Sequence, residues 1–152
     1  MSTTPAFVSR LVRLPLTDTD GDPVGRIRDV VLAPSGDNLR VLGLVANIER
    51  RNIFINMSRI AEIDPSGVRM VGGTVSVRSF TRRAGEQLAV GDLLDTKIGD
   101  EFVTDLAIGP GPDKAFWYVV LAALGRRGPL RRRAPNVVPW EQVAHHFAST
   151  PE

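Results

Sequence analysis

The chain contains no cysteine, so disulfide bonds, thiolate zinc sites and cysteine nucleophiles are excluded. Histidine is scarce as well: the two residues of this type are the neighbours His145 and His146. Adjacent side chains on a helix point about 100° apart, whereas a metal pair needs a spacing such as i, i+4. We therefore interpret this pair as a solvated helix end. The lack of cysteine fits a cytoplasmic protein, with the inner face of the membrane as a variant of that location.

Long apolar runs are also missing. Arg10 and Arg13 interrupt the N-terminal stretch, which therefore does not resemble a signal peptide. The longest apolar run, AFWYVVLAALG at residues 115–125, is shorter than the roughly 20 residues of a membrane helix. Its aromatic and β-branched residues favour a buried strand. We therefore expect a soluble chain with no membrane span.

The length and composition of the chain suit one ordinary domain or two small ones. The 152 residues are 43% hydrophobic and 24% charged, which is enough for a packed core and normal for a soluble protein. The formal net charge is only +2, although the isoelectric point is 9.7. The overall charge therefore does not indicate nucleic-acid binding, and the distribution of charge matters more.

Short β-branched runs between glycines and prolines predict a mainly all-β fold. The helical signal is thin, with one or two turns expected at residues 57–63 and 139–147. The expected strands lie at residues 24–34, 39–48, 51–57, 67–72 and 73–80.

The second half of the sequence echoes the first. VGRIRDVVLAP matches GDEFVTDLAIGP, so that Asp29 corresponds to Asp105 at an offset of 76 residues. Two copies indicate a duplication rather than a solenoid. We predict two tandem β-barrel modules at residues 7–80 and 86–148, joined by a linker at 81–85. Because the two aspartates occupy the same place in both copies, we expect them to accept backbone N–H bonds or to pair with an arginine.

The stretch DTDGDP, residues 18–23, alternates carboxylates as a calcium loop does. Asp18, Asp20 and Asp22 would fill the first three ligand positions of such a loop. Pro23, however, stands where the loop needs its glycine, and proline cannot make that turn. We interpret the stretch as the tip of a β-hairpin with weak Mg²⁺ binding as the alternative, and we expect no other metal and no cofactor.

The segments VGRIRDVVL, RVLGLV and IFINMSRI resemble a PRC-barrel domain, the small β-barrel shared by the reaction-centre H subunit and the ribosome maturation factor RimM. More narrowly, FVSRLVRLPLTDTDGDPVGRIRDVVL resembles the N-terminal cytoplasmic region of actinobacterial MgtE-type magnesium-transporter-like proteins. There a tandem PRC-barrel-like segment precedes an MgtE N domain and CBS domains. The resemblance implies a role in the regulation of magnesium transport. Asn56 departs from the pattern, because such modules often have proline there, as the second copy has in Pro139.

No sequence motif indicates an enzyme. A nucleophile elbow, a Walker loop and a dinucleotide fingerprint are all missing from the sequence. Trp117 and Trp140 suit core packing, with a base-stacking platform as the alternative. We therefore predict a non-enzymatic regulatory or adaptor module that binds a protein partner or a neighbouring domain, with a homodimer as another option.

The alternative to an adaptor is an RNA- or ribosome-associated module by analogy with RimM. Its support is the loop GRRGPLRRR at residues 125–133, which concentrates positive charge. Such a loop suits an anionic partner such as RNA or the headgroups of anionic lipids; the other interpretation is a solvated connector. The arginines in question are Arg126, Arg127, Arg131, Arg132 and Arg133.

Overall fold

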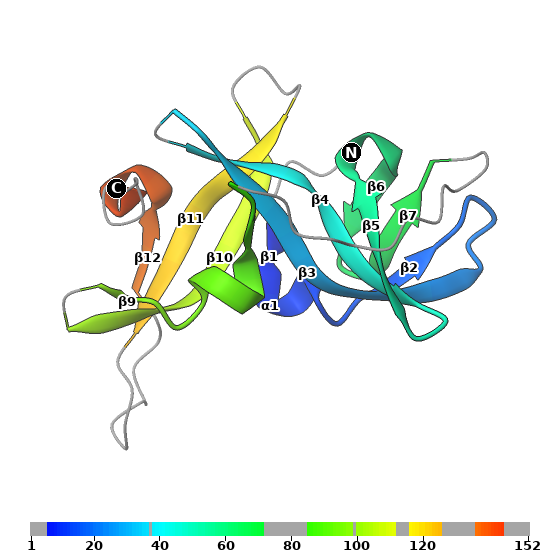
Figure 1. Ribbon diagram of the computed structural model, residues 1–152, viewed down its shortest axis with the longest axis horizontal. Coiled ribbons are helices and arrows are strands. Elements are labelled where there is room, and N and C mark those ends of the chain that lie inside the picture. The colour runs from blue at the N-terminus through cyan, green and yellow to red at the C-terminus, as the bar shows by residue number, and fades with distance from the viewer. Residues whose placement is uncertain are drawn as a thin grey trace.

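The computed structural model describes residues 6–36, 38–71, 85–98, 100–111, 116–125 and 136–144. Strands dominate it and the helices are single turns (Figure 1), which confirms the all-β class. In chain order the elements are β1 (Ala6–Phe7), α1 (Val8–Leu11), β2 (Pro15–Thr17), β3 (Pro23–Ser35), β4 (Asn38–Ile48), β5 (Arg51–Asn56), η1 (Met57–Arg59), β6 (Ile60–Asp64), β7 (Gly67–Met70), β8 (Gln87–Leu88), η2 (Ala89–Leu93), β9 (Lys97–Ile98), β10 (Glu101–Pro110), β11 (Trp117–Gly125), β12 (Asn136–Pro139) and η3 (Trp140–Gln142).

All described strands belong to one hydrogen-bonded sheet of 12 strands, which is nearly closed into a barrel. Its main path runs β1-β10-β11-β4-β3-β2-β7-β6, while β12, β5, β8 and β9 each pair with one strand of this path. We predicted two tandem barrels with separate sheets, whereas the described strands of both copies join into a single sheet. The boundaries proposed for the two modules stay a prediction.

The internal repeat is visible in the strand register. The hairpins β3–β4 and β10–β11 are both antiparallel, and each contains two bulges or irregularities. The four breaks occur at equivalent places, 76 residues apart on β3 and β10: Ile27/Asp29 and Val31/Leu32 in the first copy, and Val103/Asp105 and Ala107/Ile108 in the second. Matching bulges indicate that the two copies share backbone geometry as well as sequence pattern.

The two hairpins meet around a pseudo-twofold axis. Strands β4 and β11 share one bridging pair, Arg40 with Tyr118. Arg40 also pairs with Ala33 on β3, and Tyr118 pairs with Gly109 on β10, the position equivalent to Ala33. Arg40 and Tyr118 are therefore equivalent residues that face each other, and the axis passes between them.

Short segments that precede each copy are exchanged across this axis. The N-terminal arm, residues 6–11 (β1 and α1), pairs with β10 of the second copy. The second arm, residues 87–93 (β8 and η2), pairs with β3 of the first copy. The register is equivalent in the two cases, since Phe7 pairs with Ala107 and Leu88 pairs with Val31. Figure 1 shows α1 and β1 in blue beside β10.

Both arms contribute to the hydrophobic core. Val8 and Leu11 of the N-terminal arm are buried, as are Ala89 and Leu93 of the second arm, and all four lie in the same core cluster as the central strands. Burying side chains of the size of Val8, Leu11 and Leu93 contributes about 1.5–3 kcal/mol each. The exchange therefore fastens the two copies together by packing as well as by backbone pairing.

One local expectation holds only in part. One or two helical turns were expected within residues 57–63, and the single turn η1 ends at Arg59, where strand β6 follows from Ile60. Ile60 and Ile63 pack against the core, and β6 pairs with β7. Tertiary packing of these isoleucines, which prefer strands, outweighs the weak helical pattern. The expected strand at 73–80 lies outside the described residues.

Candidate functional site

Asp29 is the one buried charged residue in the described part of the chain. It lies on β3, and its carboxylate accepts three backbone N–H groups. Two of the donors belong to the second arm, Val90 at 2.7 Å and Gly91 at 3.1 Å, and the third is Val30 at 2.8 Å. Asp29 therefore satisfies donors at the start of η2 that have no partner within a single helical turn.

Asp105 repeats this arrangement on β10. It accepts the backbone N–H of Ser9 at 3.0 Å, the Ser9 hydroxyl, and the backbone N–H of Leu106 at 2.9 Å. Ser9 belongs to the N-terminal arm, as Val90 belongs to the second arm. Each carboxylate thus binds the arm that precedes the other copy.

The environments of the two carboxylates differ, because Asp29 is buried and Asp105 is only partly buried. Burial raises the pKa of the Asp29 carboxyl above its ordinary value of 3.8, and the nearby Asp92 adds a smaller upward effect. The bonds from Val90, Val30 and Gly91 lower this pKa but do not outweigh burial. The same burial makes Asp29 sensitive to pH in a range where most surface carboxylates are already ionised.

We expect the raised pKa of Asp29 to appear in the pH dependence of stability. Below pH 3.8 the Asp29 carboxyl is protonated in both the folded and the unfolded chain, and its contribution to stability is fully present. As pH rises through the higher folded-state pKa, that contribution is lost. The free energy of unfolding, measured with urea between pH 3.5 and 7 relative to Asp29→Asn, should fall as pH rises. A difference that stays flat or grows with pH would contradict the prediction.

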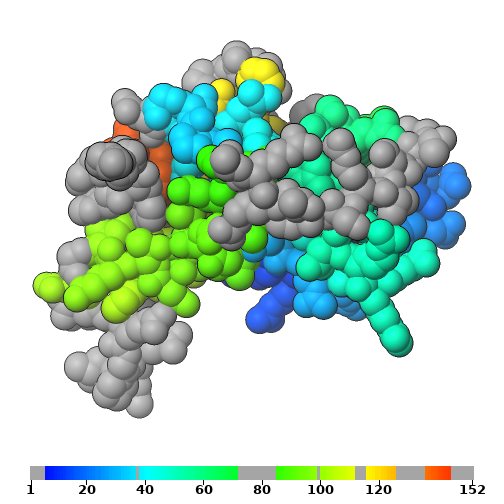
Figure 2. Space-filling view, in the orientation of Figure 1, coloured from blue at the N-terminus to red at the C-terminus, as the bar shows by residue number. Residues whose placement is uncertain are grey.

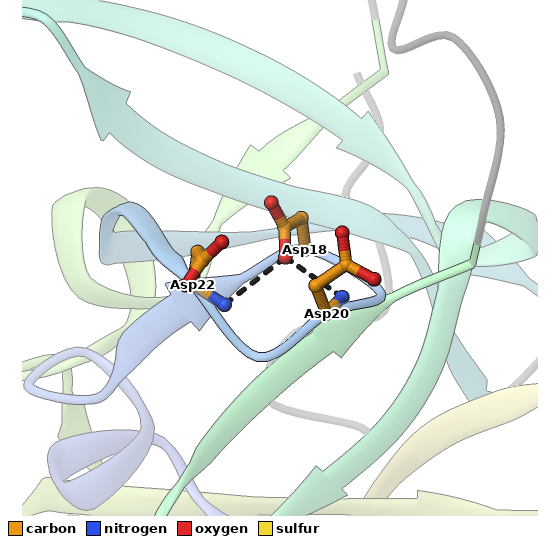
Figure 3. A group of neighbouring side chains, drawn as sticks. All are labelled: Asp18, Asp20 and Asp22. Carbon is orange, nitrogen blue, oxygen red and sulfur yellow. Dashed lines mark hydrogen bonds between the residues drawn. The ribbon is translucent and has the colours of Figure 1, made fainter.

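The three aspartates of residues 18–22 lie at the tip of the β2–β3 hairpin, as expected (Figure 3). The side chain of Asp18 accepts the backbone N–H of Asp20 at 2.9 Å and that of Asp22 at 3.0 Å. One oxygen from each of the three carboxylates lies within 4.8 Å of the others. The Asp18 carboxylate therefore already accepts hydrogen bonds within its own turn, while Asp20 and Asp22 are exposed.

Because this turn is held by its own hydrogen bonds, two of which the Asp18 carboxylate accepts, we expect no tight divalent-ion site. Isothermal titration with CaCl₂ and with MgCl₂ should show dissociation constants in the millimolar range or weaker, as in low-affinity extracellular calcium modules. Asp20→Ala should leave the titration and the stability nearly unchanged. A stoichiometric micromolar site that is lost in this variant would show that the aspartates form a binding loop.

Other residues singled out from the sequence have mixed outcomes. Trp140 is buried and Trp117 packs against the core, as expected of core residues. The histidine pair and the five arginines of the 125–133 loop lie outside the described residues. Sequence reasoning missed Arg40, whose guanidinium stacks 3.8 Å from the ring centroid of Phe116. No local pattern signals this contact, because the two residues lie on hairpins of different copies.

Searches against protein families and against curated proteins find no match to the chain. Among the described residues, no helix has both the length and the apolar character needed to cross a membrane.

Proposed function

We propose that this chain is a non-enzymatic regulatory or adaptor module of the PRC-barrel kind. In this proposal it works in the cytoplasm and docks with the cytoplasmic part of an MgtE-type magnesium-transporter-like protein. The motifs VGRIRDVVL, RVLGLV and IFINMSRI support the PRC-barrel assignment, and the duplicated hairpins with their shared bulges support a tandem arrangement.

The proposal rests on the hydrogen bonds that the carboxylates of Asp29 and Asp105 accept. A catalytic carboxylate needs a free oxygen that faces substrate. Both of these carboxylates instead bind backbone N–H groups of the exchanged arms. The most distinctive acidic residues of the sequence therefore hold two copies in one unit, which suits a platform whose task is to present surfaces to a partner.

The test is direct binding. The chain is titrated by calorimetry with a purified fragment that contains the N and CBS domains of an MgtE-type protein, with and without 10 mM Mg²⁺. We expect a one-to-one complex in the micromolar range, with an affinity that changes when Mg²⁺ is present. Absence of heat and of co-elution on gel filtration in both conditions would overturn the proposal.

The arginine loop separates this function from RNA binding. The charge-neutralising variant Arg131→Gln/Arg132→Gln/Arg133→Gln is compared with wild type for binding to structured RNA, to anionic vesicles and to the transporter fragment at two salt concentrations. Salt-sensitive RNA binding that the variant loses would favour the alternative RNA-associated function. Vesicle binding with the same behaviour would assign the loop to the membrane surface.

A further inference from the structure

The two copies differ at the outer edge of the part of the sheet that each contributes. In the first copy, β7 lies beside β2 in a parallel pair, with Leu16 opposite Val68 and Thr17 opposite Arg69. β6 then pairs with the other side of β7. The hairpin β6–β7 thus covers the edge that β2 would otherwise expose, and Leu16, Val68 and Met70 are all buried.

The equivalent edge in the second copy is β9. Leu16 pairs with Gly25 on β3, and Ile98 pairs with Glu101 on β10, which is the position 76 residues after Gly25. Within the ranges that the structure describes, β9 pairs with β10 and with no other strand. Among the described residues, β9 therefore has no counterpart of β7 on its outer side. Figure 2 shows the yellow-green segment that contains β9 at the surface of the molecule.

Burial at equivalent positions supports this difference. Leu16 is fully buried, whereas Ile98 is only partly buried. Strands β5 and β12 are equivalent, because Gly43 pairs with Asn56 and the equivalent Leu121 pairs with Pro139. The inward-facing positions of β5 are more covered than those of β12: Ile53 and Ile55 are buried, while Asn136 is exposed and Val138 is partly buried.

In the second copy, extra buried side chains lie beside β12 but do not cover the edge of β9. Trp140 and Val143 are buried beside β12 and take up space in the core. Trp140 begins η3 and Val143 follows it, and in the described part of the chain neither provides a backbone partner for β9.

We propose that the outer edge of β9 is a docking site for an extended segment of a partner polypeptide. The segment adds to the sheet parallel to β9, as β7 adds to β2, and places an aliphatic side chain against Ile98. Strand addition of this kind gains affinity from backbone hydrogen bonds and specificity from alternate side chains. The proposal rests on the adaptor function, because it names how the partner docks.

The first copy supplies a probe for this site. A synthetic peptide with the sequence of residues 60–70, IAEIDPSGVRM, is added to the full-length ¹⁵N-labelled chain. We expect saturable shifts and slower hydrogen exchange at Lys97, Ile98 and Glu101, without comparable changes at Leu16. Ile98→Asp should weaken binding at least tenfold. The matched control Val71→Asp, which changes an apolar side chain that is 42% exposed on the first copy, should bind as wild type does.

A further measurement does not depend on the folding of the Ile98 variant. The wild-type chain is titrated with the same peptide carrying Val68→Asp, which should bind at least tenfold more weakly. Equal binding of both peptides, no change at β9, or changes confined to β2 would each overturn the docking site. The adaptor function is tested separately with the transporter fragment. If that fragment binds while the peptide does not, only the β9 site is wrong.

Discussion

Replacing Asp29 with alanine is expected to lower the free energy of unfolding by about 3 kcal/mol at pH 7, since each buried donor left without a partner costs about 1–3 kcal/mol. The variant removes the acceptor for Val30, Val90 and Gly91 at once. Relief from burying a charge offsets part of this loss, so the effect stays below the sum of three separate penalties. Urea unfolding measures it.

Two matched variants serve as comparisons for the loss of stability expected of Asp29→Ala. Asp105→Ala should cost less, about 1–2 kcal/mol, because Asp105 is less buried and the donors that it releases reach water more easily. Asp100→Ala, at an exposed turn, should change stability by less than about 0.5 kcal/mol. Equal effects of Asp29→Ala and Asp100→Ala would show that the carboxylate does not hold the second arm.

A disulfide between the N-terminal arm and β10 is expected to stabilise the protein by about 4–5 kcal/mol, because it closes a loop of about 100 residues. Phe7 and Ala107 are antiparallel partners, and such pairs have Cα separations that a disulfide tolerates. The chain has no native cysteine, so Phe7→Cys/Ala107→Cys forms a single defined bond. Comparing oxidised with reduced protein by urea unfolding removes the effect of the substitutions themselves.

The equivalent pair on the other side is the control for this crosslink. Leu88→Cys/Val31→Cys closes a loop of roughly 57 residues and should stabilise by a few tenths of a kcal/mol less. Both oxidised proteins should run as monomers on a non-reducing gel. Covalent dimers from the Phe7/Ala107 variant, together with monomers from the other, would show that the N-terminal arm binds a neighbouring molecule instead of its own chain.

The strand pattern and the duplication were predictable from sequence. Runs of β-branched residues around Val30 and Val45 locate the hairpin β3–β4, and the match of Asp29 to Asp105 locates its second copy. These signals are local, since alternation and turn residues act over a few positions. The hairpin tip at Asp18–Asp22 was predictable for the same reason, because a proline rules out the competing loop geometry.

The exchange of the arms was not predictable from these patterns. Phe7 and Leu88 each belong to two-residue strands, too short to show an alternation, and their partners lie in the opposite copy. Sequence pattern indicated that Asp29 and Asp105 share a role but did not identify Val90, Gly91 and Ser9 as donors. Long-range partners of this kind depend on how whole hairpins pack, which no short window records.

The crossed arrangement of the arms also sets an order of events during synthesis. The N-terminal arm leaves the ribosome well before its partner strand β10, with which it pairs at Ala107 and Ile108. At about 5–20 residues per second, the arm waits roughly 5–20 seconds for this strand to be made. Val8 and Leu11 therefore lack the cover that β10 provides until about 100 further residues have been made.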